Sequence, residues 1–424
     1  MIKILQVRNI DSFVESRRQK TSEKDKKTVQ SILNDVRKNG DSAVKKYERK
    51  FNGRKTSQLR VSAKEIKEAR SKISNQEREA IMDMRLALSL QESEYLKILP
   101  SYKYEGDDCR ITKSFTPIPS VGCYIPGGQA RYPSSAVMSI TPAKIVGVKR
   151  IVVVSPPGPD GKIDPLTITA AKLCGATEIY KIGGAQAIGA LAYGTKSIPK
   201  VDKIIGPGGK FVSIAKSLVS DQTAIDMIAG PTELGIIADA SSDPELVALD
   251  LISQAEHSKD TMCFVITQSK PMAKQIQKSI EKLLPGTERI SIIKESISKN
   301  GFIAVCKNQN EIIELANKIA PEHMELMVKN AKTLSKKITG AGLVLIGKNT
   351  PSSASDYVLG TNHILPTNGF GRTRGGLSVL DFLKLQTAVE SSLDYLNYSE
   401  YDLETLTDAE GLPNHYKATE RRLD

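Results

Sequence analysis

From about residue 115 the chain alternates between short, β-branched apolar runs and stretches with helical periodicity, and this alternation limits the folds it can adopt. The apolar runs are RIVVVS, EIYKI, VDKII, LGIIADA, MCFVITQ, RISIIK, FIAVC and GLVLIG, and helical stretches such as PLTITAAKLCG lie between them. Strands and helices in this order predict parallel sheets with helices on both faces. The number of runs fits two such sheets better than one, so the expected fold class is α/β.

The two ends of the chain differ from this middle part. The first hundred residues show helical periodicity in TVQSILNDVRKNGDSAVKKYERKFNG, with Gly40 and Asp41 as a break, and in QEREAIMDMRLALSLQESEYLK, which Pro100 ends. The last forty residues, from about Leu380, are polar and helical in character. We therefore expect helices at the start and a small separate unit at the end.

Composition narrows the class of function. The 424 residues are 40% apolar and 25% charged, the balance of a globular protein of two or three domains. The net charge of +12 comes from interleaved acidic and basic residues, which favours a solvated surface over a nucleic-acid partner. No run is long and apolar enough for a membrane helix, and no signal peptide begins the chain. We expect a cytoplasmic protein with neither a membrane nor a nucleic-acid partner.

The cysteines exclude two classes of site. They are widely spaced, odd in number and without a CxxC pair, at Cys109, Cys123, Cys174, Cys263 and Cys306. This pattern fits neither a disulfide framework nor a thiolate zinc site. Most of the five are expected to be small buried apolar residues.

The first of the four histidines, His257, lies in SDPELVALDLISQAEHS. Ser242 or Asp243 can cap a helix that starts at Pro244, and on that helix Gln254 and His257 would project from one face. An amide oxygen and an imidazole at this spacing can share a metal ion. The same pair also occurs by chance on many helices.

His323 lies in NKIAPEHMEL, where Pro321 stops one helix and can start another. This predicts Glu322 and His323 at a helix N-terminus, as a carboxylate and an imidazole suited to proton transfer. The alternative is a surface glutamate that the helix dipole favours.

The remaining two histidines lie near the end of the chain. His363 follows Asp356 by seven residues in a loop rich in Ser, Thr, Asn and Gly, and His415 follows Glu410 in the polar tail. Gln254, His257, Asp356 and His415 together would make one nitrogen and oxygen site for a divalent metal, with zinc as the leading candidate. Glu322, His323 and His363 would remain for acid–base work.

Several longer strings resemble histidinol dehydrogenases, in the order found in that family and over nearly the whole chain. They are VRKNGDSAVKKYERKFNG, VGCYIPGGQARYPSSAVM, GGAQAIGALAYGT, VDKIIGPGG, IDMIAGPTEL, DLISQAEH, APEHMEL, SDYVLGTNHILPT and EGLPNH. The resemblance implies a four-electron oxidation of L-histidinol through histidinal to L-histidine with two NAD, the last steps of histidine biosynthesis. It also implies a homodimer with shared active sites.

The resemblance implies an organisation of two Rossmann-like, doubly wound domains with a helical N-terminal segment and a small tail. We expect the helical segment at residues 1–18 and a first, discontinuous domain with the metal site at 19–130 and 235–380. A second domain on the NAD side is expected at 131–234. The tail, 381–424, is expected to contribute to the partner subunit's site.

The resemblance also implies roles for individual residues. One zinc per subunit would be held by Gln254, His257 and Asp356, with His415 supplied across the dimer. The catalytic pair would be Glu322 and His323. Residues in contact with the substrate would include the metal ligands, His323 and Thr232, His363 and Glu410. NAD would be contacted through Tyr124, Gln186 and Gly209.

Two positions depart from the family pattern. Gly209 stands where the family usually has Asn, which removes an amide contact to NAD. Thr232 stands where a Ser is usual and keeps the hydroxyl group. The glycines of GGAQAIG could place a phosphate at a helix N-terminus or could simply permit close packing, because the spacing is not G-x-G-x-x-G.

Three alternatives remain open from the sequence. A related metal-dependent NAD alcohol dehydrogenase could act on another small polar alcohol. A basic, zinc-stabilised binding protein without catalysis would explain the charge and the metal ligands. Within the enzyme reading, a thiohemiacetal on Cys123 or Cys174 competes with a water molecule activated by Glu322 in the second oxidation, and the water route is favoured because neither thiol has an activating neighbour in sequence.

Overall fold

The computed structural model describes residues 1–18, 21–53, 58–106, 108–127 and 131–423. Residues 128–130 of the string VGCYIPGGQARYPSSAVM therefore lie outside the described part. Within that part the chain forms a six-stranded sheet, a five-stranded sheet and a three-stranded sheet, and the first two are entirely parallel. The expected α/β class with two parallel sheets is confirmed.

The five-stranded sheet has the order β6-β5-β4-β7-β8, and its neighbouring helices bury both faces. Its strands and the helices that connect them are, in chain order, β4 (Ser120–Tyr124), α6 (Pro133–Ile145), β5 (Arg150–Ser155), α7 (Pro165–Cys174), β6 (Glu178–Lys181), α8 (Gly184–Tyr193), β7 (Lys203–Ile205), α9 (Lys210–Val219) and β8 (Ala224–Ile225). The strands are short and β-branched, as expected of strands buried on both faces.

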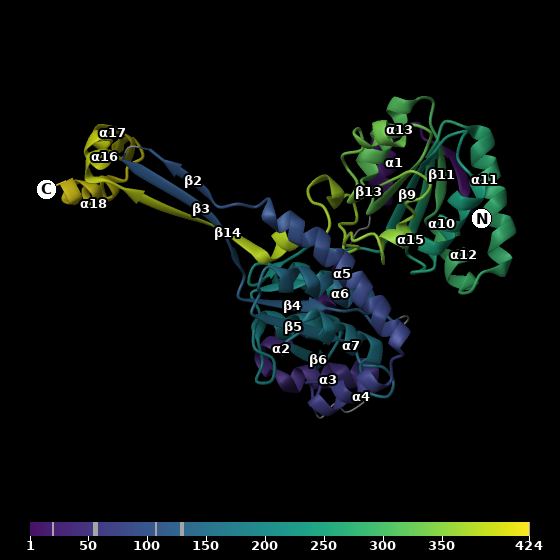
Figure 1. Ribbon diagram of the computed structural model, residues 1–424, viewed down its shortest axis with the longest axis horizontal. Helices are drawn as coiled ribbons and strands as arrows, with labels where there is room; N and C mark the ends of the chain where they lie inside the picture. Colours follow the sequence, from purple (N-terminus) through teal and green to yellow (C-terminus); the bar gives the residue numbers. More distant parts are fainter. Residues whose placement is uncertain (19–20, 54–57, 107, 128–130, 424) are drawn as a thin grey trace.

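The N-terminal helices also belong to this half, which corrects the expected domain division. They are α2 (Glu23–Asn39), α3 (Asp41–Asn52), α4 (Ala63–Ser71) and α5 (Asn75–Lys97). Helix α2 packs on α8 and α9, α3 on α8, α4 on α7, and α5 on α6, so these four helices cover the five-stranded sheet (Figure 1). Strand β4 lies in that sheet as well, although residues 19–130 were expected in the first domain.

The six-stranded sheet has the order β1-β11-β10-β9-β12-β13. Its elements are β1 (Lys3–Gln6), α1 (Ile10–Arg17), β9 (Glu233–Ala238), α10 (Pro244–Ala255), β10 (Met262–Thr267), α11 (Lys270–Leu283), η1 (Leu284–Gly286), α12 (Ile290–Lys299), β11 (Phe302–Val305), α13 (Gln309–Ile319), β12 (His323–Met327), α14 (Ala331–Ser335), β13 (Leu343–Ile346) and α15 (Ser352–Ser355). The first residues were expected to be helical, but β1 pairs in parallel with β11 and α1 follows it.

The third sheet forms an arm that projects away from both halves and carries the C-terminus at its tip (Figure 1). It is antiparallel, in the order β14-β3-β2, and joins distant parts of the sequence. Its elements and those that lead to it are β2 (Tyr102–Glu105), β3 (Cys109–Pro117), η2 (Phe370–Arg372), η3 (Val379–Phe382), β14 (Leu383–Ser391), α16 (Leu393–Tyr398), α17 (Glu400–Ala409) and α18 (Pro413–Leu423).

Three local predictions are wrong. RISIIK forms the start of helix α12, because Ile293 and Ile297 are buried with helical spacing. The residues after Pro321 form strand β12, whose five residues are all buried between β9 and β13. Residues 383–391 form a strand, because all nine pair with β3. Among the helices described, none is both long and apolar enough to cross a membrane.

Candidate active site

A cavity of about 360 Å³ is lined by residues from both the five-stranded and the six-stranded half. Pro126 and Tyr132 come from the first half, and Gln254 comes from helix α10 of the second. The residues predicted from the sequence that line this cavity are Gly209, Thr232, Gln254, His257, Glu322, His323, Asp356 and His363. Tertiary structure thus gathers most of the candidate site from segments spread over more than 150 residues.

Glu322 is held by two donors. Its Oε2 atom accepts a hydrogen bond from the Thr232 hydroxyl at 2.5 Å and another from the Glu233 amide at 3.0 Å. Burial raises the pKa of Glu322, and the neighbouring His323 opposes that shift. A buried carboxyl whose pKa lies above its ordinary value is suited to exchanging protons near neutral pH.

His323 lies between two carboxylates at the start of β12. Its Nδ1 is 3.9 Å from Glu322 Oε2, and its Nε2 is 3.6 Å from Asp356 Oδ1. Neither ring nitrogen has a hydrogen-bond partner in the described structure, although the side chain is only 2% exposed. Burial disfavours the charged imidazole, but Asp356 and Glu322 outweigh it and raise the pKa of His323 to about 9. The two carboxylates therefore favour the protonated imidazolium, so the ring must release a proton before it can accept one.

Gln254, His257 and Asp356, three of the four predicted metal donors, line the same cavity. Burial lowers the pKa of His257, which favours the neutral imidazole that metals bind. The Oδ1 atom of Asp356 is buried without a hydrogen bond, and His323 contributes to keeping the pKa of this carboxyl below its ordinary value. In the described residues no group of three or more His, Cys, Asp or Glu side chains lies together as a metal site. A complete site here would need Gln254 and a further donor.

The local structure around these donors differs in one respect from the prediction. Asp243 caps α10 as expected, but the helix ends at Ala255, so His257 lies in the turn that follows. The amide of His257 still donates to the Gln254 carbonyl at 3.2 Å, which keeps both residues at the same end of the helix. The Gln254 side chain donates to the Thr232 hydroxyl at 2.8 Å, which links the donors to Glu322.

His363 is oriented by the main chain of Asp356. Its Nδ1 atom lies 2.9 Å from the Asp356 carbonyl oxygen, so Nδ1 carries the hydrogen and Nε2 is left as the acceptor. Burial lowers the pKa of His363. The ring can therefore offer a neutral nitrogen to a ligand in the cavity.

Tyr124 and Gln186 do not line the cavity. The Tyr124 hydroxyl accepts from the Gly184 amide at 3.1 Å, and the Gln186 amide donates to the buried Glu48 carboxylate at 2.8 Å. Glu48 also accepts from the amide of Gly183, at the start of α8. A Cβ at Gly183 would lie 2.5 Å from Pro156, so this glycine permits close packing.

Glu410 and His415 lie at the tip of the arm, exposed and far from this cavity (Figure 1). The chain by itself therefore does not bring these two predicted site residues to the others.

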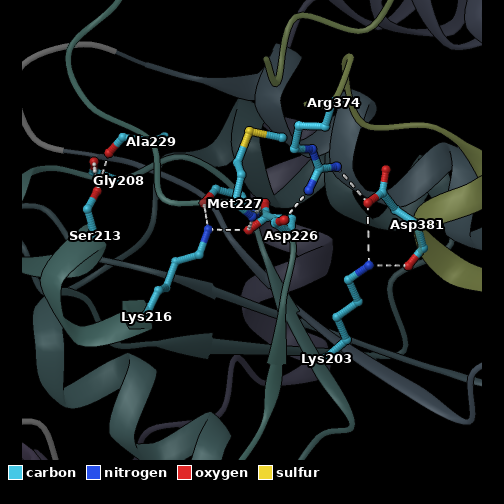
Figure 2. Close-up of polar contacts among 10 residues, drawn as sticks. Lys203, Gly208, Ser213, Lys216, Asp226, Met227, Ala229, Arg374 and Asp381 are labelled. Carbon is cyan, nitrogen blue, oxygen red and sulfur yellow. Dashed lines mark hydrogen bonds and ion pairs between the residues drawn. The ribbon is translucent and has the colours of Figure 1, made fainter. Parts of the chain in front are cut away.

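A buried ion pair holds the loop that contains Gly209. Lys216 and Asp226 pair with each other, and both side chains are at most 1% exposed. Lys216 donates to the carbonyl of Gly206 at 2.9 Å, and Asp226 accepts from the amide of Gly206 at 2.8 Å (Figure 2). Gly206 has φ +106°, and a Cβ there would lie 2.2 Å from the Tyr124 carbonyl oxygen, so only glycine fits.

The same network reaches the base of the arm. Figure 2 shows the Arg374 guanidinium between the main-chain oxygen of Asp226 and the carboxylate of Asp381. Lys203 also donates to Asp381, at 2.6 Å to its carbonyl oxygen. Charged contacts therefore join the Gly206–Gly209 loop, the loop before Thr232 and the arm.

Some cavity residues were missed from the sequence. Tyr132, Ser134 and Ser135 line it. They lie within VGCYIPGGQARYPSSAVM, one of the strings that carry the family resemblance, so this string could have identified them. Arg289 also lines the cavity, but it is the first residue of RISIIK, which was expected to form a strand and not part of a site.

Comparison with known proteins agrees with this geometry. The family model described as histidinol dehydrogenase matches residues 15–423. A histidinol dehydrogenase from Methanococcus maripaludis is 42% identical over 94% of this chain and 93% of its own length, and one from Bacillus licheniformis is 39% identical over 95% and 94%. The crystal structure of histidinol dehydrogenase from Elizabethkingia anophelis superposes with a TM-score of 0.93 at 33% identity, covering 100% of this chain and 98% of that one. The chain therefore belongs to the histidinol dehydrogenase family of NAD-dependent oxidoreductases.

Proposed function

We propose that the cavity between the two sheets is where this chain oxidises L-histidinol to L-histidine, with Glu322 and His323 as the catalytic pair. The observation that carries the proposal is the position of His323, which is buried between Glu322 and Asp356 and has no hydrogen bond to either ring nitrogen within the described residues. His323 accepts the proton of the substrate hydroxyl, and Glu322 activates the water molecule that adds to the aldehyde. Two NAD molecules, held one after the other on the side of Gly209, would each supply the acceptor for one hydride.

The donor set fits one zinc ion. Gln254, His257 and Asp356 offer an amide oxygen, a neutral imidazole and a carboxylate oxygen without a hydrogen-bond partner. Oxygen and nitrogen donors of this kind suit a borderline divalent metal. Zinc, when bound, would supply a fixed positive centre that orients the amino and imidazole nitrogens of histidinol.

The fourth donor would come from a second copy of the chain. His415 and Glu410 are exposed on the arm, and neither residue lines the cavity. Exposed apolar side chains lie on the tip of the arm, among them Tyr401, Leu406 and Leu412. Their counterpart beside the cavity is an apolar rim formed by Met82, Leu86, Leu90, Val358 and Leu359.

This rim is continuous. The three α5 residues are spaced four apart and lie on one side of the helix. Gly360 approaches the main chain of Ala87, so the 358–359 loop lies against α5, and the neighbouring Tyr357 lines the cavity. An arm from the partner that covers this rim would bring its Glu410 and His415 to the cavity mouth.

Mixed dimers test the shared site. Chains carrying His415→Ala and chains carrying His323→Ala are each expected to be inactive, and mixing them should restore about a quarter to a half of the activity if sites are shared. No recovery in mixtures that do form heterodimers would contradict the cross-subunit assignment.

The cysteine route for the second oxidation has little support. Cys123 and Cys174 are buried in the core of the five-stranded half and do not line the cavity. Burial raises the pKa of Cys174 to about 11 and that of Cys123 still further, so neither thiol ionises readily. A Cys123→Ala/Cys174→Ala double variant is expected to keep both oxidations, and selective loss of aldehyde oxidation would contradict the water route.

The first experiment is a count of NADH formed per L-histidinol consumed, with and without a chelator. Two NADH per histidinol, lost on chelation and restored by zinc, would support the proposal. Turnover of a different small alcohol, with none of histidinol, would favour the related dehydrogenase instead. Metal binding without any NAD turnover would favour a binding protein.

A further inference from the structure

Two arginines line the cavity, and they differ in their partners. The Arg131 guanidinium lies 2.8 Å from Asp164 and 3.7 Å from Glu77. Arg289 is half-buried, yet its side chain forms no hydrogen bond or ion pair with any residue in the described part of the chain. Arg289 is therefore a cation in the cavity without an internal partner.

The backbone at Arg289 is strained. Its φ is +53° and its ψ is 25°, in the left-handed region that is unfavourable for a residue with a side chain. It occupies the N-cap position of α12 but makes no side-chain cap, and Ser, Asp, Asn or Gly would suit that position better. Neither helix capping nor an ion pair explains an arginine there. Strained residues of this kind are found mostly at functional sites.

The position of Arg289 indicates which ligand it meets. Helix α12 packs on α10, the helix that carries Gln254, and Arg289 shares the cavity wall with Glu256 and His257. All of these belong to the six-stranded half, which holds the proposed metal donors and catalytic pair. The residues expected to contact NAD, Tyr124, Gln186 and Gly209, belong to the five-stranded half. The substrate is thus the nearer candidate for the cation.

The chemistry of the proposed reaction creates an anion in this cavity. In the second oxidation the hydrated aldehyde, R–CH(OH)₂, loses a hydride to NAD and two protons, and R–COO⁻ remains. With the amino and imidazole nitrogens of the substrate directed at the metal donors, the carboxylate is the group left without a partner. A guanidinium can bind a carboxylate through two parallel hydrogen bonds.

We propose that Arg289 binds the carboxylate formed in the second oxidation and so acts as a product-binding residue. The inference rests on the proposed function, because it needs histidinol as substrate. This role distinguishes the two oxidations, because the alcohol has no negative charge for Arg289 to bind, whereas the carboxylate product does.

Three variants test this role in the zinc-loaded protein. Arg289→Gly removes the cation and suits the left-handed backbone, Arg289→Lys keeps the charge without the planar fork, and Lys294→Ala removes an exposed charge from the same helix as a control. In Arg289→Gly we expect the inhibition constant of L-histidine to rise about 10- to 100-fold, as for loss of a charged hydrogen bond. The KM values of histidinol and NAD should change by less than about threefold.

Further readouts separate this role from a structural one. Arg289→Gly should unfold at a higher temperature than wild type, because the strain is relieved, while it binds L-histidine more weakly. Arg289→Lys should lie between, and Lys294→Ala should match wild type. A rise in the KM of NAD with unchanged L-histidine inhibition would overturn the proposal in favour of a cofactor phosphate contact. Unchanged L-histidine binding in both Arg289 variants would overturn it outright.

Failure of the proposed function would look different. Wild-type protein would then not oxidise histidinol. Calorimetric titration of L-histidine into wild type and the Arg289 variants would still decide whether this residue binds the carboxylate.

Discussion

The two parallel sheets present opposite edges to the same cavity. In the five-stranded half, Pro126 follows β4 and Pro207–Gly209 follow β7, so the cavity wall is made by loops at the carboxyl ends of strands. In the six-stranded half, Thr232 precedes β9 and His323 begins β12, so the wall is the amino edge of the sheet. Ligands of open α/β sheets usually lie at the carboxyl edge.

The chemical character of the two walls differs accordingly. The five-stranded wall consists largely of proline, glycine and serine, and these small residues would allow the phosphate or ribose groups of a cofactor to approach closely. The six-stranded wall buries Glu322, His323 and Asp356 together, and burial and their mutual interactions shift their pKa values. This difference supports the proposal that one half binds the cofactor while the other performs the proton transfers and holds a metal ion.

The largest test of this division is His323→Ala. We expect both oxidations to slow by about 10²- to 10⁴-fold, because the base that accepts the proton is lost. NAD affinity, measured by fluorescence titration, should stay within about twofold of wild type, since the residue belongs to the other wall. Retention of more than a tenth of the activity would remove His323 from the catalytic pair.

Lys216→Met tests the five-stranded half. The substitution leaves Asp226 buried without its cation, so the free energy of unfolding should fall by about 3–5 kcal/mol. The KM of NAD should rise more than that of histidinol, because the Gly206–Gly209 loop loses an anchor. Adding Asp226→Asn should recover part of the stability, measured by urea unfolding.

A control for this variant lies on the same helix. Lys210→Ala removes an exposed ion pair with Asp25 and should cost less than about 1 kcal/mol. An equal loss in the two lysine variants would argue against a special role for the buried pair.

Glu92→Gln probes the joint between the five-stranded half and the arm. Glu92 on α5 accepts from the Val379 amide at 2.7 Å, and burial, with Asp381 nearby, raises its pKa to about 7. The folded state therefore holds the proton more tightly than the unfolded state, and stability is lost as pH rises from about 4.5 to 7. Glutamine keeps an acceptor without the charge, so the variant should be about 1–2 kcal/mol more stable than wild type at pH 8.

Thermal unfolding of both proteins at pH 5 and pH 8 checks this prediction. The difference between them should shrink at pH 5, where Glu92 is already protonated. A difference that is the same at both pH values would show that the carboxyl does not titrate in this range.

The smallest effect is expected from Gly209→Asn, which restores the amide usual in the family. A Cβ at Gly209 would have no atom within 4 Å, so a side chain fits without displacement. One added hydrogen bond to the cofactor should lower the KM of NAD about 2- to 10-fold and leave the histidinol KM unchanged. A lower KM of histidinol instead would contradict the assignment of the five-stranded wall to the cofactor.

Much of this protein follows from its sequence alone. Alternating apolar runs and helices predicted two parallel sheets, and the start of the helix capped by Asp243 was placed correctly, since both depend on local periodicity and capping. The motifs around the histidines identified residues such as Gln254 and His323, which line one cavity. These residues could be identified because side-chain chemistry and family resemblance both depend on which residue stands at each position, and the sequence gives this directly.

Only the tertiary structure decided how these pieces meet. HMELM became a strand because it lies between β9 and β13, and residues 383–391 became one because β3 pairs with them. Long-range pairing of this kind leaves little trace in local sequence. Three other features depend on contacts between distant residues, which periodicity does not encode. They are the packing of the N-terminal helices on the five-stranded sheet, the burial of Gln186 against Glu48 and the strained backbone of Arg289 in the cavity wall.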